Sequence, residues 1–259
     1  MTEAPHGHYV ALGSSFAAGP GIRPRESGSP RRAGRSSANA AHLVAARLGV
    51  PLTDVSCSGA TAAQLVDGGP GMPAQVEAVS SATSLVTVTA GGNDVGYIGG
   101  LIMASLPRPL RAWAQWRARR TAVEPLENRF ARLPATLDRL LGTITDRAPQ
   151  ATVVVVDYLT VLPPAGVPAP PLPDEVADQA RKTADRLAAE TAAAAERHGC
   201  LLVRASAVSA DHHAWSAHPW TTGFSLGRRS AAPYHPNADG MRAIAELVVD
   251  AVQDTGSAD

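Results

Sequence analysis

The chain has 259 residues, with 23 acidic and 23 basic side chains and a formal net charge of zero. This length suits one large domain with a substantial core, and the balanced charge gives no global attraction to nucleic acid. The N-terminus lacks the basic start and apolar region of a secretory signal, and no apolar run is long enough to cross a membrane. These observations predict a cytoplasmic protein that binds no nucleic acid and has no stable membrane anchor.

The first part of the chain alternates between strand and helix patterns. A short apolar strand is predicted at residues 8–12, and a loop rich in Gly, Pro, Arg and Ser follows over 19–37. An amphipathic helix is predicted over 41–48, and two further strands over 52–56 and 85–89. Each of these strands ends in a glycine-containing loop.

A segment at about residues 97–125 differs from its surroundings. Its apolar side chains, Trp113 and Trp116 among them, are interspersed with arginines. We interpret this segment as a helical flap or insertion, while ordinary packing is the alternative. The interspersed arginines would suit either a solvated face or an interfacial surface.

The second part of the chain continues the alternation. Its pattern predicts helices at 126–147, at 174–198 and after Asn237, and strands at 153–157 and 201–203. Strands that alternate with helices indicate a parallel sheet covered on both faces. We therefore predict one α/β domain over residues 1–259, with no internal repeat or linker.

Four positions carry the polar chemistry of the predicted sheet edge. Ser15, Gly59 and Asn93 follow the first three strands, and His235 precedes the last helix. Loops at the same edge of a parallel sheet are neighbours in space. A serine nucleophile needs a base within hydrogen-bond reach, and His235 is placed to supply it. The backbone N–H groups of Ser15 and Gly59 and the Asn93 amide can hold an oxyanion.

In order and approximate spacing, these positions resemble the signature blocks of the SGNH hydrolases, also called GDSL esterases and lipases. Ser15 matches the serine of block one, Gly59 the glycine of block two, Asn93 the asparagine of block three and His235 the histidine of block five. The blocks span residues 9–245. The resemblance implies a three-layer α/β/α sandwich around a mostly parallel, five-stranded, flavodoxin-like sheet.

Within that family, the chain is most similar to actinobacterial esterases and lipases, through residues 57–61 and the Pro219-Trp220 pair. The disulfides of the secreted relatives have no counterpart here. The two cysteines, Cys57 and Cys200, do not have the pattern of a disulfide framework. Cys200 falls in a predicted buried strand, where a free thiol acts as a small apolar side chain.

Two departures from the family pattern concern the catalytic residues. Ser14 stands where the family has aspartate, so two serines are adjacent, and the alignment of block one selects Ser15. Ala232 stands where the family has its acid. Some actinobacterial relatives use a backbone carbonyl instead, which implies a Ser–His dyad with the carbonyl of Ala232 or Pro233 orienting the imidazole. Asp211 is a more distant acid that could serve instead.

Several polar residues have simpler structural interpretations. Asp94 is expected to bond nearby backbone, and Asn237 to cap the last helix. His212, His213 and His218 have no regular metal-ligand spacing. We therefore expect no metal and no organic cofactor.

The resemblance implies a serine esterase or lipase that cleaves a small-molecule carboxylic ester through an acyl-enzyme. A carbohydrate O-acetyl esterase or a thioesterase of the same fold is one alternative, and a catalytically degenerate binding domain is another. A flavodoxin-like carbohydrate or nucleotide binder is disfavoured, because no glycine-rich phosphate loop opens a helix. An α/β-hydrolase is disfavoured because only one strand precedes Ser15. The sequence leaves the acyl chain length and the oligomeric state open.

Overall fold

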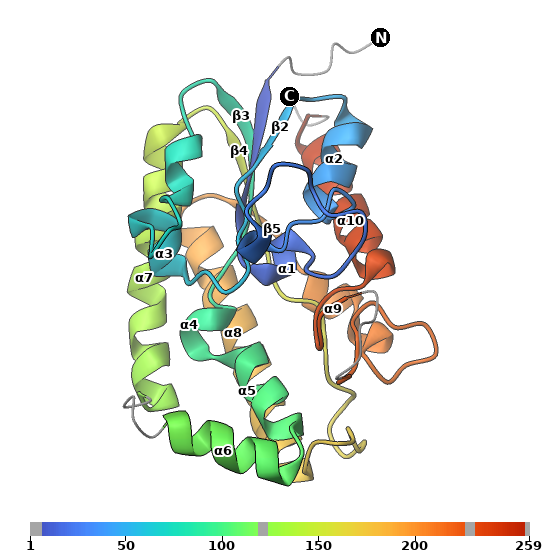
Figure 1. Cartoon of the computed structure of the whole chain (residues 1–259). Coiled ribbons are helices and arrows are strands. Elements are labelled where there is room, and N and C mark those ends of the chain that lie inside the picture. Colours follow the sequence, from blue (N-terminus) through green and yellow to red (C-terminus); the bar gives the residue numbers. More distant parts are fainter. Residues whose placement is uncertain (1–6, 119–123, 226–230, 257–259) are drawn as a thin grey trace.

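The computed structural model describes residues 7–118, 124–225 and 231–256 (Figure 1). Five strands form one sheet in the order β2-β1-β3-β4-β5, and every pairing is parallel. This is the strand order of flavodoxin-like folds, and it confirms the predicted fold class. The strands are β1 (His8–Gly13), β2 (Leu52–Asp54), β3 (Thr83–Thr89), β4 (Thr152–Val156) and β5 (Leu201–Val203).

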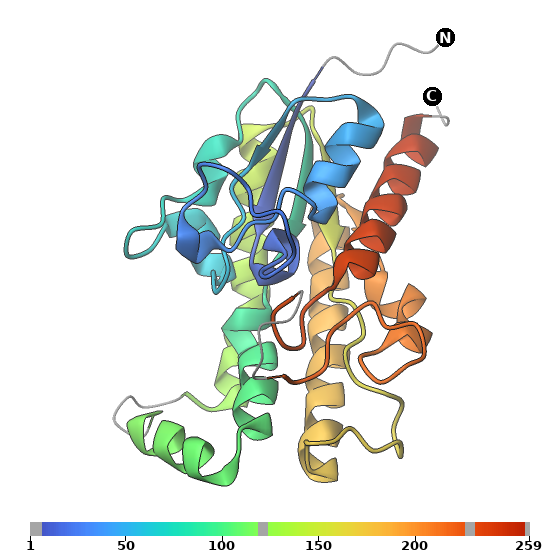
Figure 2. The same ribbon diagram turned by 45° about the vertical axis from the view of Figure 1, so that its right-hand side comes forward.

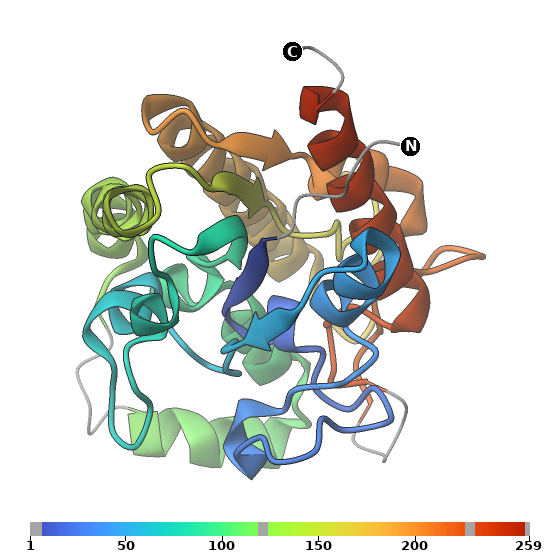
Figure 3. The same ribbon diagram turned by 90° about the horizontal axis from the view of Figure 1, so that it is seen from above.

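Helices cover both faces of this sheet, which Figure 3 shows from above. On one face, α2 (Ala40–Leu48) packs beside α10 (Ala238–Gly256). On the other face, α7 (Leu126–Arg147) packs between α3 (Ala62–Asp67) and α8 (Asp174–Arg197). The three layers bury a single core, because the sheet residues between the two helical layers are apolar on both sides.

The long helices form because apolar residues recur at helical spacing. In α7 the buried residues are Phe130, Leu133, Leu137, Leu140, Leu141 and Ile144, and the helix has the predicted bounds. For α8 the sequence pattern predicts an inner face of Val176, Ala180, Ala184, Leu187, Thr191 and Ala194, and four of these six residues are buried: Ala180, Leu187, Thr191 and Ala194. Val176 and Ala184 are only partly buried, whereas Ala177 and Thr183 are buried. The buried stripe therefore curves around the helix more than the predicted spacing allowed.

Short elements lie at the carboxyl end of the sheet and in the connections. The α-helical ones are α1 (Ser15–Ala18), α4 (Gly92–Val95) and α9 (Ala205–Val208), and the 3₁₀ turns are η1 (Arg31–Ala33), η2 (Gln75–Ala78) and η3 (Ala210–His212). Three of these, α1, α4 and α9, begin directly beyond the carboxyl ends of strands. They set the polar residues of the sheet edge in place.

The segment interpreted as a flap forms two helices, α5 (Tyr97–Ser105) and α6 (Arg108–Ala118). Figure 2 shows both beyond the carboxyl ends of the strands, with α6 at the far end of the molecule. Its motion as a flap stays a prediction, and residues 119–123 lie outside the described part of the chain. Within the described residues, every helix is too short or too polar to cross a membrane.

The prediction for Cys200 is wrong in one respect. Cys200 directly precedes β5, which has the predicted bounds of 201–203, and its side chain is only half-buried. Burial still raises the pKa of this thiol to about 11, so the reactive thiolate is scarce at neutral pH. Both cysteines are free thiols in the structure.

Candidate active site

Ser15 lies where β1 stops and α1 begins. Gly13 has a φ of 144°, and a side chain there would come within 2.7 Å of the Thr89 carbonyl on β3. Glycine therefore allows the two strand ends to approach closely. The Gln75 side chain bonds both the N–H and the carbonyl of Gly13, at 2.8 and 3.1 Å. The turn that presents Ser15 is thus fixed from both sides.

The two adjacent serines have different partners. The Ser15 hydroxyl lies 2.8 Å from Nε2 of His235. The Ser14 hydroxyl points elsewhere, to the Tyr158 hydroxyl at 3.3 Å, and Ser14 is almost completely buried. The Tyr158 hydroxyl also accepts the Gly92 N–H at 2.9 Å. The structure therefore brings Ser15, and not Ser14, to the imidazole.

His235 ends a tight turn. Its N–H donates to the Ala232 carbonyl at 3.2 Å, with proline at position 233 and a φ of 59° at Tyr234. This is the pattern of a type II turn. Nδ1 of His235 lies 2.7 Å from the Pro233 carbonyl. A carbonyl only accepts, so Nδ1 carries the proton and Nε2 is free to accept from Ser15.

The two predicted carbonyls thus have separate partners. Pro233 supplies the acceptor for the imidazole, whereas the Ala232 carbonyl accepts the Thr222 hydroxyl at 2.6 Å. Asp211 lies in η3, and within the described residues no carboxylate bonds to His235. A backbone carbonyl occupies the place of the family's acid.

Tyr234 has a left-handed backbone conformation, with a φ of 59°. For a residue other than glycine, this conformation costs about 1–3 kcal/mol of conformational free energy. Its surroundings offset this cost. The side chain is fully buried, its hydroxyl bonds Ser105 at 2.6 Å, and its N–H donates to the Thr222 carbonyl at 3.1 Å. Ser105 ends α5, so this helix is tied directly to the residue that precedes His235.

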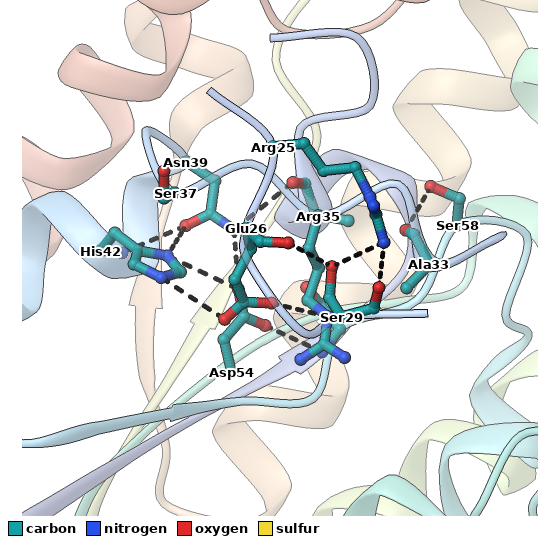
Figure 4. Close-up of polar contacts among 12 residues, drawn as sticks. Arg25, Glu26, Ser29, Ala33, Arg35, Ser37, Asn39, His42, Asp54 and Ser58 are labelled. Atoms are coloured by element: carbon teal, nitrogen blue, oxygen red, sulfur yellow. Dashed lines mark hydrogen bonds and ion pairs between the residues drawn. The ribbon is translucent and has the colours of Figure 1, made fainter. Parts of the chain in front are cut away.

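The loop after α1 supports the same turn. The Pro20 carbonyl accepts the Ala232 N–H at 2.9 Å. Figure 4 shows how this loop is held further along. Glu26 faces Arg35 at 3.3 Å and His42 at 3.5 Å, and the Asn39 side chain donates to Asp54 at 2.7 Å. These contacts join the loop to α2 and β2, and through them to the sheet.

The imidazole lies in an apolar setting. His235 is buried, and the Phe16 ring lies 5.4 Å from it. Burial lowers the pKa of His235, and the bond to the Pro233 carbonyl opposes this effect without cancelling it. The side chain is therefore neutral at neutral pH, which is the form that accepts a proton.

The predicted oxyanion donors lie on loops that are bonded to one another. The Asn93 amide donates to the Ala60 carbonyl at 2.8 Å, and the Cys57 N–H donates to the Gly13 carbonyl at 3.0 Å. These bonds place Asn93 beside Gly59 and connect the Gly59 loop to the end of β1. Among the described residues, the N–H groups of Ser15 and Gly59 have no acceptor. An amide has two donor hydrogens, so Asn93 keeps a second one.

Asp94 and Asn237 have the structural parts that the sequence predicts. The Asp94 carboxylate accepts the Ala62 N–H at 2.9 Å and so holds the start of α3. Burial raises the pKa of Asp94, against the effect of its backbone bonds. The Asn237 side chain accepts the Gly240 N–H at 2.9 Å and caps α10. Both bonds fix segments on which site residues lie.

The histidines near α9 take part in packing. The His212 ring stacks on Trp220 at 4.0 Å, and its Nδ1 lies 2.7 Å from the His218 carbonyl. The described residues contain no group of three or more side chains arranged to hold a metal ion. The Trp220 carbonyl accepts the Asn237 N–H at 2.9 Å, so this packing supports the segment that follows His235.

Sequence reasoning missed four side chains that build the site: Gln75, Ser105, Tyr158 and Thr222. Tyr158 follows β4 at the carboxyl edge of the sheet, and that position is a signal that could have found it. Gln75 lies in η2, Ser105 at the end of α5 and Thr222 in a loop, and none of the three belongs to a motif. They bond backbone or hydroxyl groups of distant segments, which only the folded chain reveals.

The site combines a serine hydroxyl bonded to a neutral imidazole with free N–H donors, at the carboxyl edge of a parallel sheet. These features define the class of serine acyl hydrolases. Comparison with known proteins agrees with this class. The family model described as GDSL-like lipase/acylhydrolase matches residues 11–243. The chain therefore belongs to the GDSL-like lipase/acylhydrolase family, as its sequence resemblance indicates, and it is a carboxylic ester hydrolase with the SGNH hydrolase fold.

Relatives from Streptomyces cover nearly the whole chain. A lipase of Streptomyces rimosus is 30% identical over 233 residues, which are 90% of this chain and 82% of the relative. Lipase 2 of Streptomyces coelicolor is 32% identical over 252 residues, 93% of this chain and 84% of the relative.

Crystal structures give the same result for the fold. Phospholipase A1 from Streptomyces albidoflavus NA297 superposes with a TM-score of 0.77 at 25% identity, covering 96% of this chain and 99% of that protein. An extracellular lipase from Streptomyces rimosus superposes with a TM-score of 0.74 at 28% identity, with the same coverage.

Proposed function

We propose that this protein hydrolyses esters with an apolar acyl group through an acyl-enzyme, with Ser15 as the nucleophile and His235 as the base. One observation carries the proposal: the Ser15 hydroxyl is 2.8 Å from Nε2 of His235, while Nδ1 is bonded to the Pro233 carbonyl. This is the geometry in which a dyad transfers a proton. The relatives described as lipases and phospholipase A1 support the choice of substrate class.

The reaction proceeds in two steps. Nε2 of His235 takes the Ser15 proton as the hydroxyl oxygen attacks the ester carbonyl. The imidazolium then protonates the leaving alcohol, and an acyl-enzyme remains. In the second step His235 removes a proton from water, which attacks the acyl carbonyl. The bond from the carbonyl carbon to the Ser15 oxygen then breaks, the imidazolium returns its proton to that oxygen, and the acid is released. The Pro233 carbonyl holds the imidazole and stabilises its cation in both steps.

Three donors would hold the oxyanion of each tetrahedral intermediate. Two are the N–H groups of Ser15 and Gly59, which have no acceptor among the described residues. Nothing would lie within 4 Å of a side chain at Gly59, so the space beside it is open. The third donor is the remaining hydrogen of the Asn93 amide. Preorganised donors of this kind stabilise the transition state more than the substrate.

Asn93→Ala is expected to lower kcat by about 10²- to 10³-fold, because one oxyanion donor is lost. KM for a soluble ester should change little, since the donor acts on charge that develops in the transition state. Steady-state kinetics on a p-nitrophenyl ester measures both constants. The thermal midpoint of the variant serves as the control, because the bond from Asn93 to Ala60 is lost as well. A variant with unchanged kcat would remove Asn93 from the oxyanion site.

The pH dependence follows from the lowered pKa of His235. Only the neutral imidazole is a base, so kcat/KM falls as His235 gains a proton. We expect kcat/KM to be constant through neutral pH and to fall only below the ordinary histidine pKa of about 6.5. A pH–rate profile with a soluble ester measures this limb. An acidic limb that lies above pH 6.5 would contradict the burial argument.

A fluorophosphonate probe tests the proposal most directly, because it labels serines that are activated as nucleophiles. Mass spectrometry of the labelled protein should place the adduct on Ser15. The degenerate binding domain considered from the sequence predicts no adduct in the folded protein. A panel from acetyl to palmitoyl esters, run beside acetylated sugars and thioesters, then separates the lipase from the other esterases of this fold.

The cytoplasmic location stays a prediction.

A further inference from the structure

Helix α6 exposes large apolar side chains to solvent. Trp113 and Trp116 are 56% and 57% exposed, and Leu110 is 48% exposed. Among the exposed large apolar residues of the described chain, these tryptophans are the largest. Burying side chains of this size is strongly favourable, so their exposure indicates a surface that meets another apolar phase.

The same helix is basic in a chain whose net charge is zero. It carries Arg108, Arg111 and Arg117, and no acidic residue occurs between Asp94 and Glu124. Arg108 is exposed, whereas Arg111 donates to the Ala104 carbonyl of α5 at 3.1 Å. The combination of arginine with exposed tryptophan on a short helix is typical of a segment that lies at a lipid interface.

The position of α6 connects it to the active site. Figure 2 shows α6 beyond the carboxyl ends of the strands. Ser15 begins α1 directly after β1, so it lies at the same edge of the sheet. The Arg111 bond holds α6 to α5, and Ser105 at the end of α5 bonds Tyr234, the residue before His235. The helix is therefore held at the active-site end of the molecule.

We infer that α6 is a peripheral docking surface for an anionic lipid surface. Trp113 and Trp116 would enter the headgroup layer, and Arg108 would pair with lipid phosphates. The charge complementarity of a basic, aromatic helix selects this occupant. The contact is reversible, because one short helix buries little apolar area, and it weakens as salt screens the arginines. The role of this surface would be to bring the ester site to lipid substrates, and only that role rests on the proposed function.

Vesicle co-sedimentation tests the contact apart from catalysis. The Ser15→Ala protein is used, so that the vesicles are not hydrolysed. We expect it to bind vesicles of phosphatidylcholine mixed with phosphatidylglycerol at least about 10-fold more tightly than vesicles of phosphatidylcholine alone. Raising the salt concentration should reduce this difference.

Substitutions then locate the surface. In the same background, Trp113→Ser with Trp116→Ser is expected to weaken vesicle binding by at least about 10-fold. Arg108→Gln should reduce the preference for the anionic vesicles. Val167→Ser with Val208→Ser is the matched control, because these side chains are similarly exposed, at 47% and 50%, but belong to the connection before α8 and to α9 instead of α6. That control should bind as tightly as its parent.

Other results would overturn the inference. Unchanged binding of the double tryptophan variant would do so, as would the absence of binding to anionic vesicles at low salt. A second copy of the chain is the other possible occupant of this surface, and sedimentation velocity tests for it. Self-association that disappears in the tryptophan variant, without vesicle binding, would make α6 a contact between copies of the chain.

Kinetics on a soluble ester separates the docking surface from the proposed function. The tryptophan variant with Ser15 intact should keep its kcat/KM within about two-fold, because the contacts described for Ser15 and His235 include none from α6. If the unaltered protein lacks ester turnover but Ser15→Ala binds vesicles, the proposed function fails and the docking surface stands.

Discussion

Ser15→Ala is expected to lower kcat/KM for a p-nitrophenyl ester by about 10⁴- to 10⁶-fold. The substitution removes the oxygen that forms the acyl-enzyme and leaves only substrate binding and the oxyanion donors. The fold should be retained, since the hydroxyl has His235 as its only partner among the described residues. Steady-state and burst kinetics on the purified variant measure the loss, and a circular dichroism spectrum checks the fold.

Ser14→Ala is the matched control, because the two serines are adjacent and chemically identical. Its hydroxyl contacts Tyr158 at 3.3 Å and no base. We expect the variant to keep its activity within about 10-fold and to lose about 1 kcal/mol of stability with the buried bond. If Ser14→Ala is the inactive variant and Ser15→Ala is not, the assignment of the nucleophile is wrong.

The sequence was sufficient to predict the sheet and the place of the site on it. Apolar strands that end in glycine loops are a local pattern, and the carboxyl edge of a parallel sheet brings such loops together. Ser15 and His235 are 220 residues apart in the chain and are in contact in the structure. The choice between Ser14 and Ser15 as the nucleophile could not be made from such a local pattern. Neither residue has a local signal, and only the alignment with the family blocks selected one of them.

The support of His235 was not predictable in the same way. The sequence left the carbonyls of Ala232 and Pro233 as alternatives, because the choice depends on the turn type. Proline at position 233 favours a type II turn, but that turn prefers glycine or asparagine at position 234. Tyr234 adopts the required conformation only because Ser105 and Thr222, from distant segments, hold it there. Such long-range compensation has no local pattern.

His235→Ala is expected to lower kcat/KM by about 10⁴-fold or more, because the Ser15 hydroxyl then lacks a base and the leaving alcohol lacks an acid. Combining it with Ser15→Ala should cost little beyond either single change, since the two residues act as one unit. Kinetics of the two single variants and the double variant measures this non-additivity. Independent, multiplying losses would contradict the dyad.

Asp211→Asn decides whether a carboxylate assists this histidine. In the structure Nδ1 of His235 donates to the Pro233 carbonyl at 2.7 Å, which leaves no other N–H donor on the neutral ring for a carboxylate. We therefore expect kcat/KM and the acidic limb of the pH profile to match those of the unaltered enzyme. In a triad, the corresponding Asp to Asn change lowers kcat by about 10⁴-fold, because it favours the wrong tautomer. A backbone carbonyl cannot be titrated, so its dyad should also keep its activity at pH values at which a carboxylate partner would be protonated, as long as His235 itself stays neutral.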